Sequence, residues 1–164
     1  MKLLIIGVGQ LGHVAREIAL DCGYSDIKFL DDCSTRDDVI GTISDIEKVS
    51  NEYTNVIVAI GNNEKRCSVI NSIPSSMNLV TLIHPKAYVS GSARIEKGCI
   101  VMPLAAINTN VIIEYGCIIG LNAVIDHNAS LGICTHIDCG ANVRPSTCVD
   151  MFAKVCANEV FENR

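Results

Sequence analysis

The chain has 164 residues, enough for one large domain or two small ones; 49% of them are hydrophobic and only 4% are aromatic. A core of Ile, Val, Ala and Cys suits narrow, repetitive packing better than a globular core built on aromatic rings. The net charge of −5 is spread without a block of like charges, which argues against a nucleic-acid or anionic-membrane partner.

The first residues carry no targeting signal. The apolar segment after Met1 is interrupted by Gly7 and Gly9, so it is too short for a signal peptide. No stretch of the sequence has the length of a transmembrane helix. We therefore expect a cytoplasmic protein without membrane insertion.

The first part of the chain alternates predicted strands and helices. The predicted strands are 2–6, 27–30 and 56–60, and the predicted helices follow Gly12 and cover 44–49 and 64–70. Ser44 is the expected N-cap of the middle helix, with Glu47 in the capping-box position. Alternation of this kind indicates a small parallel sheet, so we predict an α/β domain over residues 1–76.

The second part has a six-residue period, which predicts a parallel β-helix over residues 77–164. Every sixth residue is Ile, Val or Leu: Ile83, Val89, Ile95, Val101, Ile107, Ile113, Ile119, Ile125, Leu131, Ile137, Val143, Val149 and Val155. Small or β-branched residues stand two positions earlier, on the same side of each strand. Three hexads make one triangular coil, so Ile107, Ile125 and Val143 should stack in one column. After Val155 we expect the chain to leave the repeat and the β-helix to be short.

A glycine-rich loop is the first candidate site. Gly7, Gly9 and Gly12 lie between a strand and a helix, as in nucleotide-binding loops, where a helix N-terminus faces a phosphate. Asp31 and Asp32, at the end of the second strand, are candidates for holding a ribose or base. The alternative is a tight turn with solvated aspartates. The domain is too small for a full dinucleotide site, which favours a nucleotide linked to another group over NAD.

Two histidines of the predicted β-helix are the next candidates. His127 lies two residues past an inward position, at a coil corner, and His136 directly precedes inward-facing Ile137, so both should point outward. Histidine suits general-base chemistry near neutral pH. The alternative is a pair of plain surface histidines. His84, before Pro85 at the junction of the two parts, is interpreted as structural.

The nine cysteines are interpreted as reduced structural residues. Cys99 and Cys117 occupy small-residue positions of the hexad, where Cys is a compact apolar filler. Cys134 and Cys139 flank His136 without the C-x-x-C spacing of a zinc site, so no metal is expected.

Several short segments, taken in order, resemble a known family. They are Leu4–Gly9, Phe29–Asp32, Val58–Asn62, Leu82–Pro85, Asp126–His127 and Thr135–Ile137. Over essentially its whole length the chain resembles the bacterial sugar O- and N-acetyltransferases of the sialic-acid O-acetyltransferase type, which include enzymes acting on nucleotide-activated amino-sugars. The resemblance implies a small Rossmann-like α/β domain followed by a left-handed β-helix of hexapeptide repeats. It also implies a homotrimer, a nucleotide-sugar substrate, and acetyl-CoA bound between neighbouring subunits.

The same resemblance implies residue roles. His127 falls on the family's catalytic base, which takes a proton from the sugar amine or hydroxyl, and His136 on a histidine that contacts acetyl-CoA. Asp126 and Asn128 are the expected supports of the base. The expected substrate-binding residues are Gly9, Gln10, Leu11, Asp31 and Asp32.

The chain departs from the family pattern at a few positions. Leu11 and His13 stand where the loop often carries His and Lys, and Leu11 cannot hydrogen-bond a sugar or phosphate. Asn128 replaces a common acid, which predicts a less basic His127 unless Asp126 substitutes. Gly120 replaces a common Asn.

We therefore predict an acetyl-CoA-dependent acetyltransferase that modifies an amino or hydroxyl group of a nucleotide-linked sugar in surface-glycan synthesis. The alternative is a degenerate, non-catalytic trimeric binding or scaffold protein of the same fold. A small NAD-dependent oxidoreductase is a third hypothesis, but it rests on the glycine loop alone and gives the β-helix no role.

Overall fold

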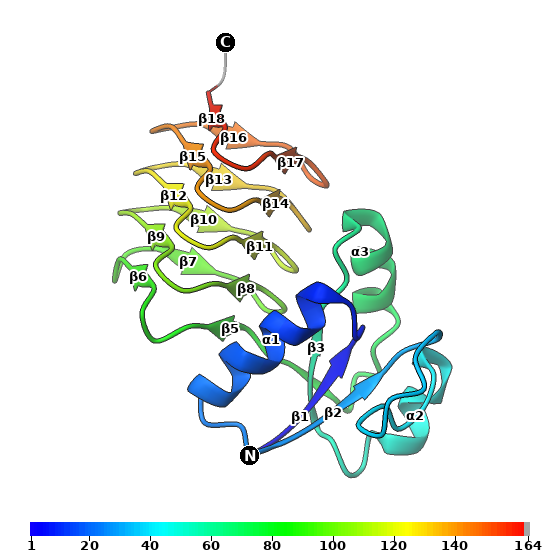
Figure 1. Ribbon diagram of the computed structural model, residues 1–164. Helices are drawn as coiled ribbons and strands as arrows, with labels where there is room; N and C mark the ends of the chain where they lie inside the picture. Colours follow the sequence, from blue (N-terminus) through cyan, green and yellow to red (C-terminus); the bar gives the residue numbers. More distant parts are fainter. Residues whose placement is uncertain (163–164) are drawn as a thin grey trace.

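The computed structural model describes residues 1–162, so residues 163 and 164 of the predicted second domain lie outside the described residues. An α/β part is followed by a stack of short parallel strands (Figure 1). The first part contains β1 (Lys2–Ile6), α1 (Gln10–Asp21), β2 (Asp26–Leu30), a 3₁₀ turn (Ile43–Asp45), α2 (Ile46–Val49), β3 (Asn55–Val58), α3 (Asn63–Asn71) and β4 (Asn78–Leu79). Its parallel sheet has the order β2-β1-β3-β4, so β4, which follows the predicted boundary at residue 76, completes this sheet.

The predicted cap of the middle helix is wrong. Asp45, not Ser44, is the N-cap of α2, and the capping box belongs to the preceding 3₁₀ turn, where Thr42 is the N-cap and Asp45 its partner. The reason is that a 3₁₀ turn precedes α2, which shifts the first helical turn toward the N-terminus.

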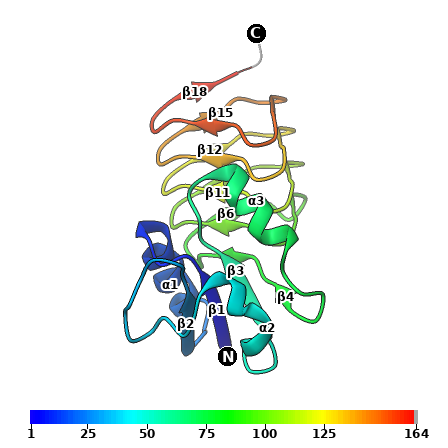
Figure 2. The same cartoon turned by 90° about the vertical axis from the view of Figure 1, so that its right-hand side faces the viewer.

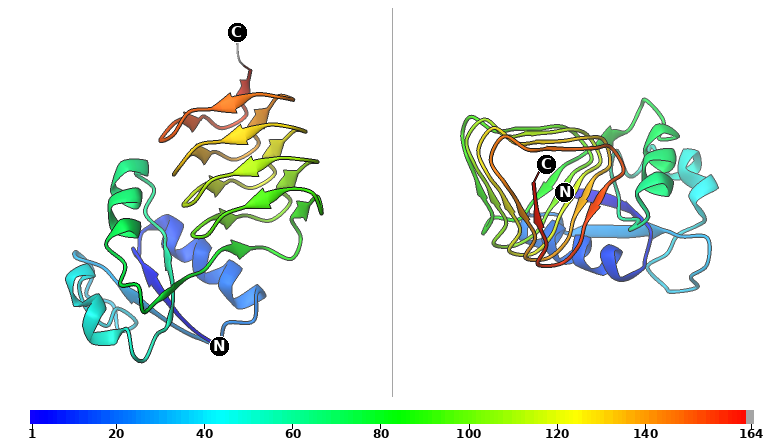
Figure 3. Two further views of the ribbon diagram at one scale, coloured as in Figure 1. Left: turned by 180° about the vertical axis from the view of Figure 1, so that it is seen from behind. Right: turned by 90° about the horizontal axis from the view of Figure 1, so that it is seen from above.

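The second part is a left-handed β-helix of two-residue strands joined by tight turns. The strands are β5 (Leu82–Ile83), β6 (Tyr88–Val89), β7 (Arg94–Ile95), β8 (Ile100–Val101), β9 (Ala106–Ile107), β10 (Ile112–Ile113), β11 (Ile118–Ile119), β12 (Val124–Ile125), β13 (Ser130–Leu131), β14 (His136–Ile137), β15 (Asn142–Val143), β16 (Cys148–Val149), β17 (Lys154–Val155) and β18 (Val160–Phe161). Viewed from above, the coils form a triangular outline (Figure 3).

Three parallel sheets form the sides of this triangle. The β5 sheet contains β5, β8, β11, β14 and β17; the β6 sheet contains β6, β9, β12, β15 and β18; the β7 sheet contains β7, β10, β13 and β16. Ile107, Ile125 and Val143 pair in register in the β6 sheet, which confirms the predicted column. The inward residues form one buried core in which Cys99 and Cys117 are fully buried.

The repeat does not end at Val155. Val160 and Phe161 pair with Asn142 and Val143, and Phe161 packs against the core of the β-helix in the next hexad position. The prediction that the chain leaves the repeat after Val155 is therefore wrong. The sequence pattern did not predict this strand because Phe161 stands where the other hexads have an aliphatic residue, and the exposed Glu159 stands at the small-residue position. The strand still forms because its backbone hydrogen bonds do not depend on the side chains at these two positions.

The α/β part packs against the outer face of the β5 sheet. Leu82, Ile100 and Ile118 of that face are buried in one cluster with Leu3 and Ile5 of β1. In Figure 2, α3 lies alongside the stacked coils rather than below them. His84 is buried at the junction and its Nε2 lies 2.9 Å from the Asp21 carboxylate at the end of α1, which agrees with its structural interpretation.

Candidate active site

A pocket of about 430 Å³ lies at the carboxyl edge of the α/β sheet, where ligands of open parallel sheets bind. It is lined by Gly7, Gly9, Gln10, Leu11, Asp31, Asp32, Cys33, Ile43, Ala59, Ile60, Gly61 and Lys65. The structure thus brings together all five residues predicted to bind the substrate. The contributions of Gly61 and Lys65 were not predicted from the sequence. Gly61 follows directly on a predicted strand, as loop residues at this edge must, whereas Lys65 lies in the first turn of α3.

The glycine loop forms the tight turn that its pattern predicts. Gly7 has a positive φ of 100°, and a Cβ on Gly12 would overlap the carbonyl oxygen of Gly7. Gly9 is the N-cap of α1 and provides no side chain, so the first-turn N–H groups of this 12-residue helix stay available at the pocket. The loop therefore presents backbone donors and a helix N-terminus, which together favour an anion.

The two aspartates differ in what they leave for a ligand. Asp31 accepts hydrogen bonds from the backbone N–H of Val8 and of Cys33, both at 2.9 Å, and these bonds hold its pKa below the usual range. Asp32 accepts one bond, from the N–H of Ile43 at 3.0 Å, and is exposed. Asp31 thus ties the loop to β2, whereas Asp32 keeps one carboxylate oxygen free for a ligand.

His127 lies at the turn between β12 and β13 and is exposed. Its Nδ1 is 2.9 Å from the side-chain nitrogen of Asn128, whose oxygen accepts a hydrogen bond from the Asn110 amide at 3.2 Å. Asn128 has a positive φ of 59°, a conformation that Asn and Asp tolerate better than most residues. The stacked Asn110 and Asn128 amides therefore support the ring, and Asn128 also suits the left-handed backbone of the turn.

Asp126 does not contact the imidazole ring through any hydrogen bond. Its Oδ1 accepts the backbone N–H of His127 at 2.7 Å and the side-chain amide of Asn108 at 2.9 Å. The His127 N–H is also the main cause of its lowered pKa. Asp126 fixes the turn, and its charge acts on the imidazole through space and not through a hydrogen bond to Nδ1.

His136 lies on the outer face of the β5 sheet, between Ile118 and Lys154 in the ladder. It is half-buried, and desolvation lowers its pKa to about 4. The ring is therefore neutral near pH 7, fit to make hydrogen bonds without charge. It lies on the side of the triangle that the α/β part covers.

One chain does not bring the two histidines together. His127 is at the corner between the β6 and β7 sheets, which in a triangular coil is opposite the β5 sheet that carries His136 and the α/β part. The pocket and His136 thus share one side, and His127 lies on the other.

Gly120 has a structural explanation. A Cβ at this position would lie 2.6 Å from backbone atoms of Asp138 and Cys139 in the next coil. The adjacent coil therefore leaves no room for the Asn that stands here in the family pattern.

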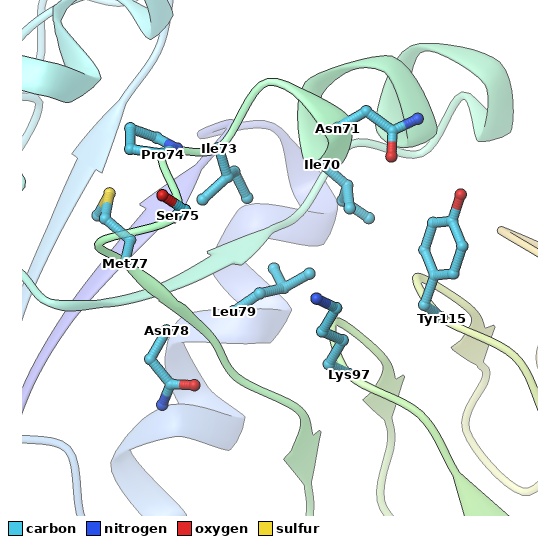
Figure 4. Close-up of a pocket in the computed structure, with 10 residues that line it drawn as sticks. All are labelled: Ile70, Asn71, Ile73, Pro74, Ser75, Met77, Asn78, Leu79, Lys97 and Tyr115. Atoms are coloured by element: carbon cyan, nitrogen blue, oxygen red, sulfur yellow. The ribbon is translucent and has the colours of Figure 1, made fainter.

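A larger hollow of about 550 Å³ lies between the end of α3, β4 and the first coils (Figure 4). Its lining combines apolar residues such as Ile70 and Leu79 with polar ones, which are Asn71, Ser75, Asn78, Lys97 and Tyr115. It contains none of the predicted site residues, and the Tyr115 hydroxyl lies 3.7 Å from Cys67 Sγ.

No disulfide joins any of the nine cysteines, all of which lie within the described residues. Within residues 1–162, no group of three or more His, Cys, Asp or Glu side chains is arranged to hold a metal ion. In the same described range, no helix is long and apolar enough to cross a membrane.

Comparison with known proteins agrees with this architecture. Residues 2–73 match the family model of the PglD N-terminal domain. The acetyltransferase domain of PglB from Neisseria gonorrhoeae is 31% identical with a TM-score of 0.85, over 95% of this chain and 91% of that one. The same domain in complex with acetyl coenzyme A is 32% identical with a TM-score of 0.86, over 98% and 90%.

A further match is to a histidine-to-alanine mutant of GDP-perosamine N-acetyltransferase from Caulobacter crescentus, in complex with CoA and GDP-perosamine. It is 26% identical with a TM-score of 0.87, over 99% of this chain and 90% of that one. The chain belongs to the hexapeptide-repeat sugar acetyltransferase family. The predicted fold, family and enzyme class, an acetyl-CoA-dependent sugar acetyltransferase, are confirmed.

Proposed function

We propose that this protein transfers the acetyl group of acetyl-CoA to an amino or hydroxyl group of a nucleotide-linked sugar, with His127 as general base. One observation carries the proposal: a single chain combines a pocket with helix N-terminal donors and an exposed, amide-supported histidine, in the fold of an enzyme holding CoA and GDP-perosamine. The predicted cytoplasmic location and glycan pathway stay predictions.

The sheet order suggests how the nucleotide sugar lies. Asp32 follows β2, the glycine loop follows the central strand β1, and Gly61 follows β3. A nucleoside over Asp32 puts the phosphates over the N-terminus of α1 and directs the sugar past Gly61. Gly61 also borders a hollow formed with Lys154, the neighbour of His136 in the β5 sheet. The sugar is thus directed toward the His136 side of the β-helix.

The active site, in this proposal, is shared between two copies of the chain. His127 lies at the corner opposite its own pocket, so it serves the pocket of a neighbouring copy. A closed ring of three copies, in which each chain gives its histidine to the next, supplies every pocket with a base. This geometry supports the predicted homotrimer.

The chemistry requires neutral His127 with its Nε2 lone pair free. As the sugar nitrogen or oxygen bonds to the thioester carbonyl carbon, Nε2 takes its proton. The carbon–sulfur bond then breaks, and CoA leaves as the thiolate and is protonated. A backbone N–H of the coil stabilises the carbonyl oxygen as it gains charge. Neutral His136 offers acetyl-CoA a hydrogen bond without competing for the proton.

The test is release of free CoA thiol with a panel of nucleotide-linked amino-sugars and their hydroxyl analogues. The His127→Ala variant should lose about 10²- to 10⁴-fold in kcat, the usual contribution of a general base. His13→Ala, an exposed histidine outside the pocket lining, is the matched control and should retain activity. Absence of thiol release with every substrate would refute the proposal.

Mixing two inactive variants tests the shared site. His127→Ala and Asp32→Ala each remove one half of the site, and co-refolded mixtures should regain activity because some interfaces then combine an intact pocket with an intact histidine. If both variants are inactive alone and the mixture also stays inactive, His127 does not serve a neighbouring pocket.

A non-catalytic binding or scaffold protein is the second candidate. It is favoured by the orientation of the Asn128 amide, whose nitrogen faces Nδ1. An amide that donates to Nδ1 leaves the proton on Nε2, where a base must be free. This candidate predicts that nucleotide sugar and acetyl-CoA bind but that no thiol is released.

A further inference from the structure

The pocket has a cation that comes from α3 and not from the glycine loop. Lys65 lines the pocket, and among the pocket-lining residues of the described chain it alone carries a positive charge. Its charge also lowers the pKa of Asp31. Within residues 1–162 its ammonium forms no hydrogen bond or ion pair, so it is available to a ligand.

His13 occupies the loop position where the family pattern often carries Lys, but its side chain contacts Arg36 and not the pocket. His13 is exposed on α1 and does not line the pocket. Its ring nitrogen Nε2 lies 2.9 Å from Nη1 of Arg36, which is itself paired with Asp38 at 2.7 Å. The loop therefore offers backbone donors but no cationic side chain.

The position of Lys65 is fixed from two directions. Asn62, the N-cap of α3, accepts the backbone N–H of Lys65 at 2.8 Å. The next residue, Arg66, is fully buried and donates to the carbonyls of Ile60 and Gly61, which also line the pocket. The first turn of α3 is thus attached to the pocket wall, and Lys65 is held on the β3 side, across from Asp32 on the β2 side.

We propose that Lys65 binds the diphosphate of the substrate, together with the N-terminus of α1, and replaces the basic residue that the glycine loop lacks. The inference rests on the proposed function, because it assumes a nucleotide-linked sugar. A pocket with two carboxylates repels a diphosphate unless a cation compensates, and Lys65 is the residue that can do so. Lysine binds phosphate as a point charge and needs no exact geometry.

The experiment compares ligands with and without the diphosphate. UDP and uridine, and GDP and guanosine, are titrated calorimetrically into the full-length wild type and into Lys65→Met, Lys65→Arg and His13→Ala. Lys65→Met should weaken diphosphate binding about tenfold or more, as expected for a charge-assisted contact, and leave nucleoside binding unchanged. Lys65→Arg should retain most of the affinity, and His13→Ala all of it.

Each outcome has one interpretation. If Lys65→Met keeps its preference for diphosphate over nucleoside, or if His13→Ala loses it, the assignment to Lys65 is wrong although the proposed function stands. If the wild type binds neither diphosphate, the proposed nucleotide-sugar substrate fails first. A circular-dichroism melt of each variant checks folding, which the exposed Lys65 side chain should not affect.

Discussion

Nε of Arg66 donates to the carbonyl oxygen of Gly116 at 2.7 Å, deep in the seam between α3 and the β-helix. The same guanidinium reaches the carbonyl of Cys134 at 2.6 Å, and Asn63 donates to the carbonyls of Phe152 and Ala153. These turns lie above one another in successive coils. One helix face therefore clamps three coils, and Nη1 of Arg66 also holds the pocket wall through the carbonyl of Ile60.

Arg66→Met should lower the free energy of unfolding by about 3–5 kcal/mol, because it leaves several buried carbonyls without donors. Arg66→Lys should recover only part of this loss, since one ammonium cannot span the set. Urea denaturation measures the effect, and Arg94→Met, on an exposed strand position, is the control that should change stability by less than about 0.5 kcal/mol. Equal stability of the two methionine variants would contradict the clamp.

Asn128→Asp should increase activity. A carboxylate accepts only, so it fixes the proton on Nδ1 of His127 and frees Nε2, whereas the Asn128 amide nitrogen donates to Nδ1 and leaves the proton on Nε2. The negative charge should also move the acidic limb of the kcat/KM profile to higher pH. Asn128→Gly is the matched control, because it keeps the positive-φ turn and removes the amide, and it should lower kcat. An Asp variant no better than the Gly variant would argue against this role.

Stability should fall as the pH drops from about 6.5 to about 4 because of His136. The unfolded chain binds a proton near the ordinary histidine value of 6.5, whereas the folded chain binds it only near 4, so protons in this window favour unfolding. Chemical denaturation at several pH values measures the slope. In His136→Gln the slope should be smaller over this window, and an unchanged slope would show that burial of the ring does not cause it.

Gly12→Ala should destabilise the fold by more than about 1 kcal/mol, because its Cβ would overlap the Gly7 carbonyl. Gly9→Ala is the matched control in the same loop, since a Cβ there meets nothing within 4 Å. The difference in melting temperature between the two variants tests whether the third glycine serves loop packing. Two equally stable variants would rule this out.

Much of the fold follows from local patterns that can be recognised directly in the sequence. The six-residue period fixes the columns of the β-helix, because inward side chains must alternate and stack whatever lies around them. The strand–glycine–helix pattern likewise fixes the loop at the edge of the α/β sheet. The sequence was less informative where a single residue sets the local structure. Phe161 continues the repeat although the aliphatic pattern ends before it, and Asp45 replaces Ser44 as the cap of α2.

The sequence alone determined that His127 faces outward at a coil corner and that Asp31 and Asp32 follow a strand, since both depend only on local periodicity. Only the tertiary structure decided which residues meet. Folding used both oxygens of Asp31 for backbone N–H groups, brought Lys65 to the pocket from a distant helix, and set His127 across the triangle from His136. The physical reason is that side-chain partners are set by packing between elements, and a period along the chain cannot specify which elements touch.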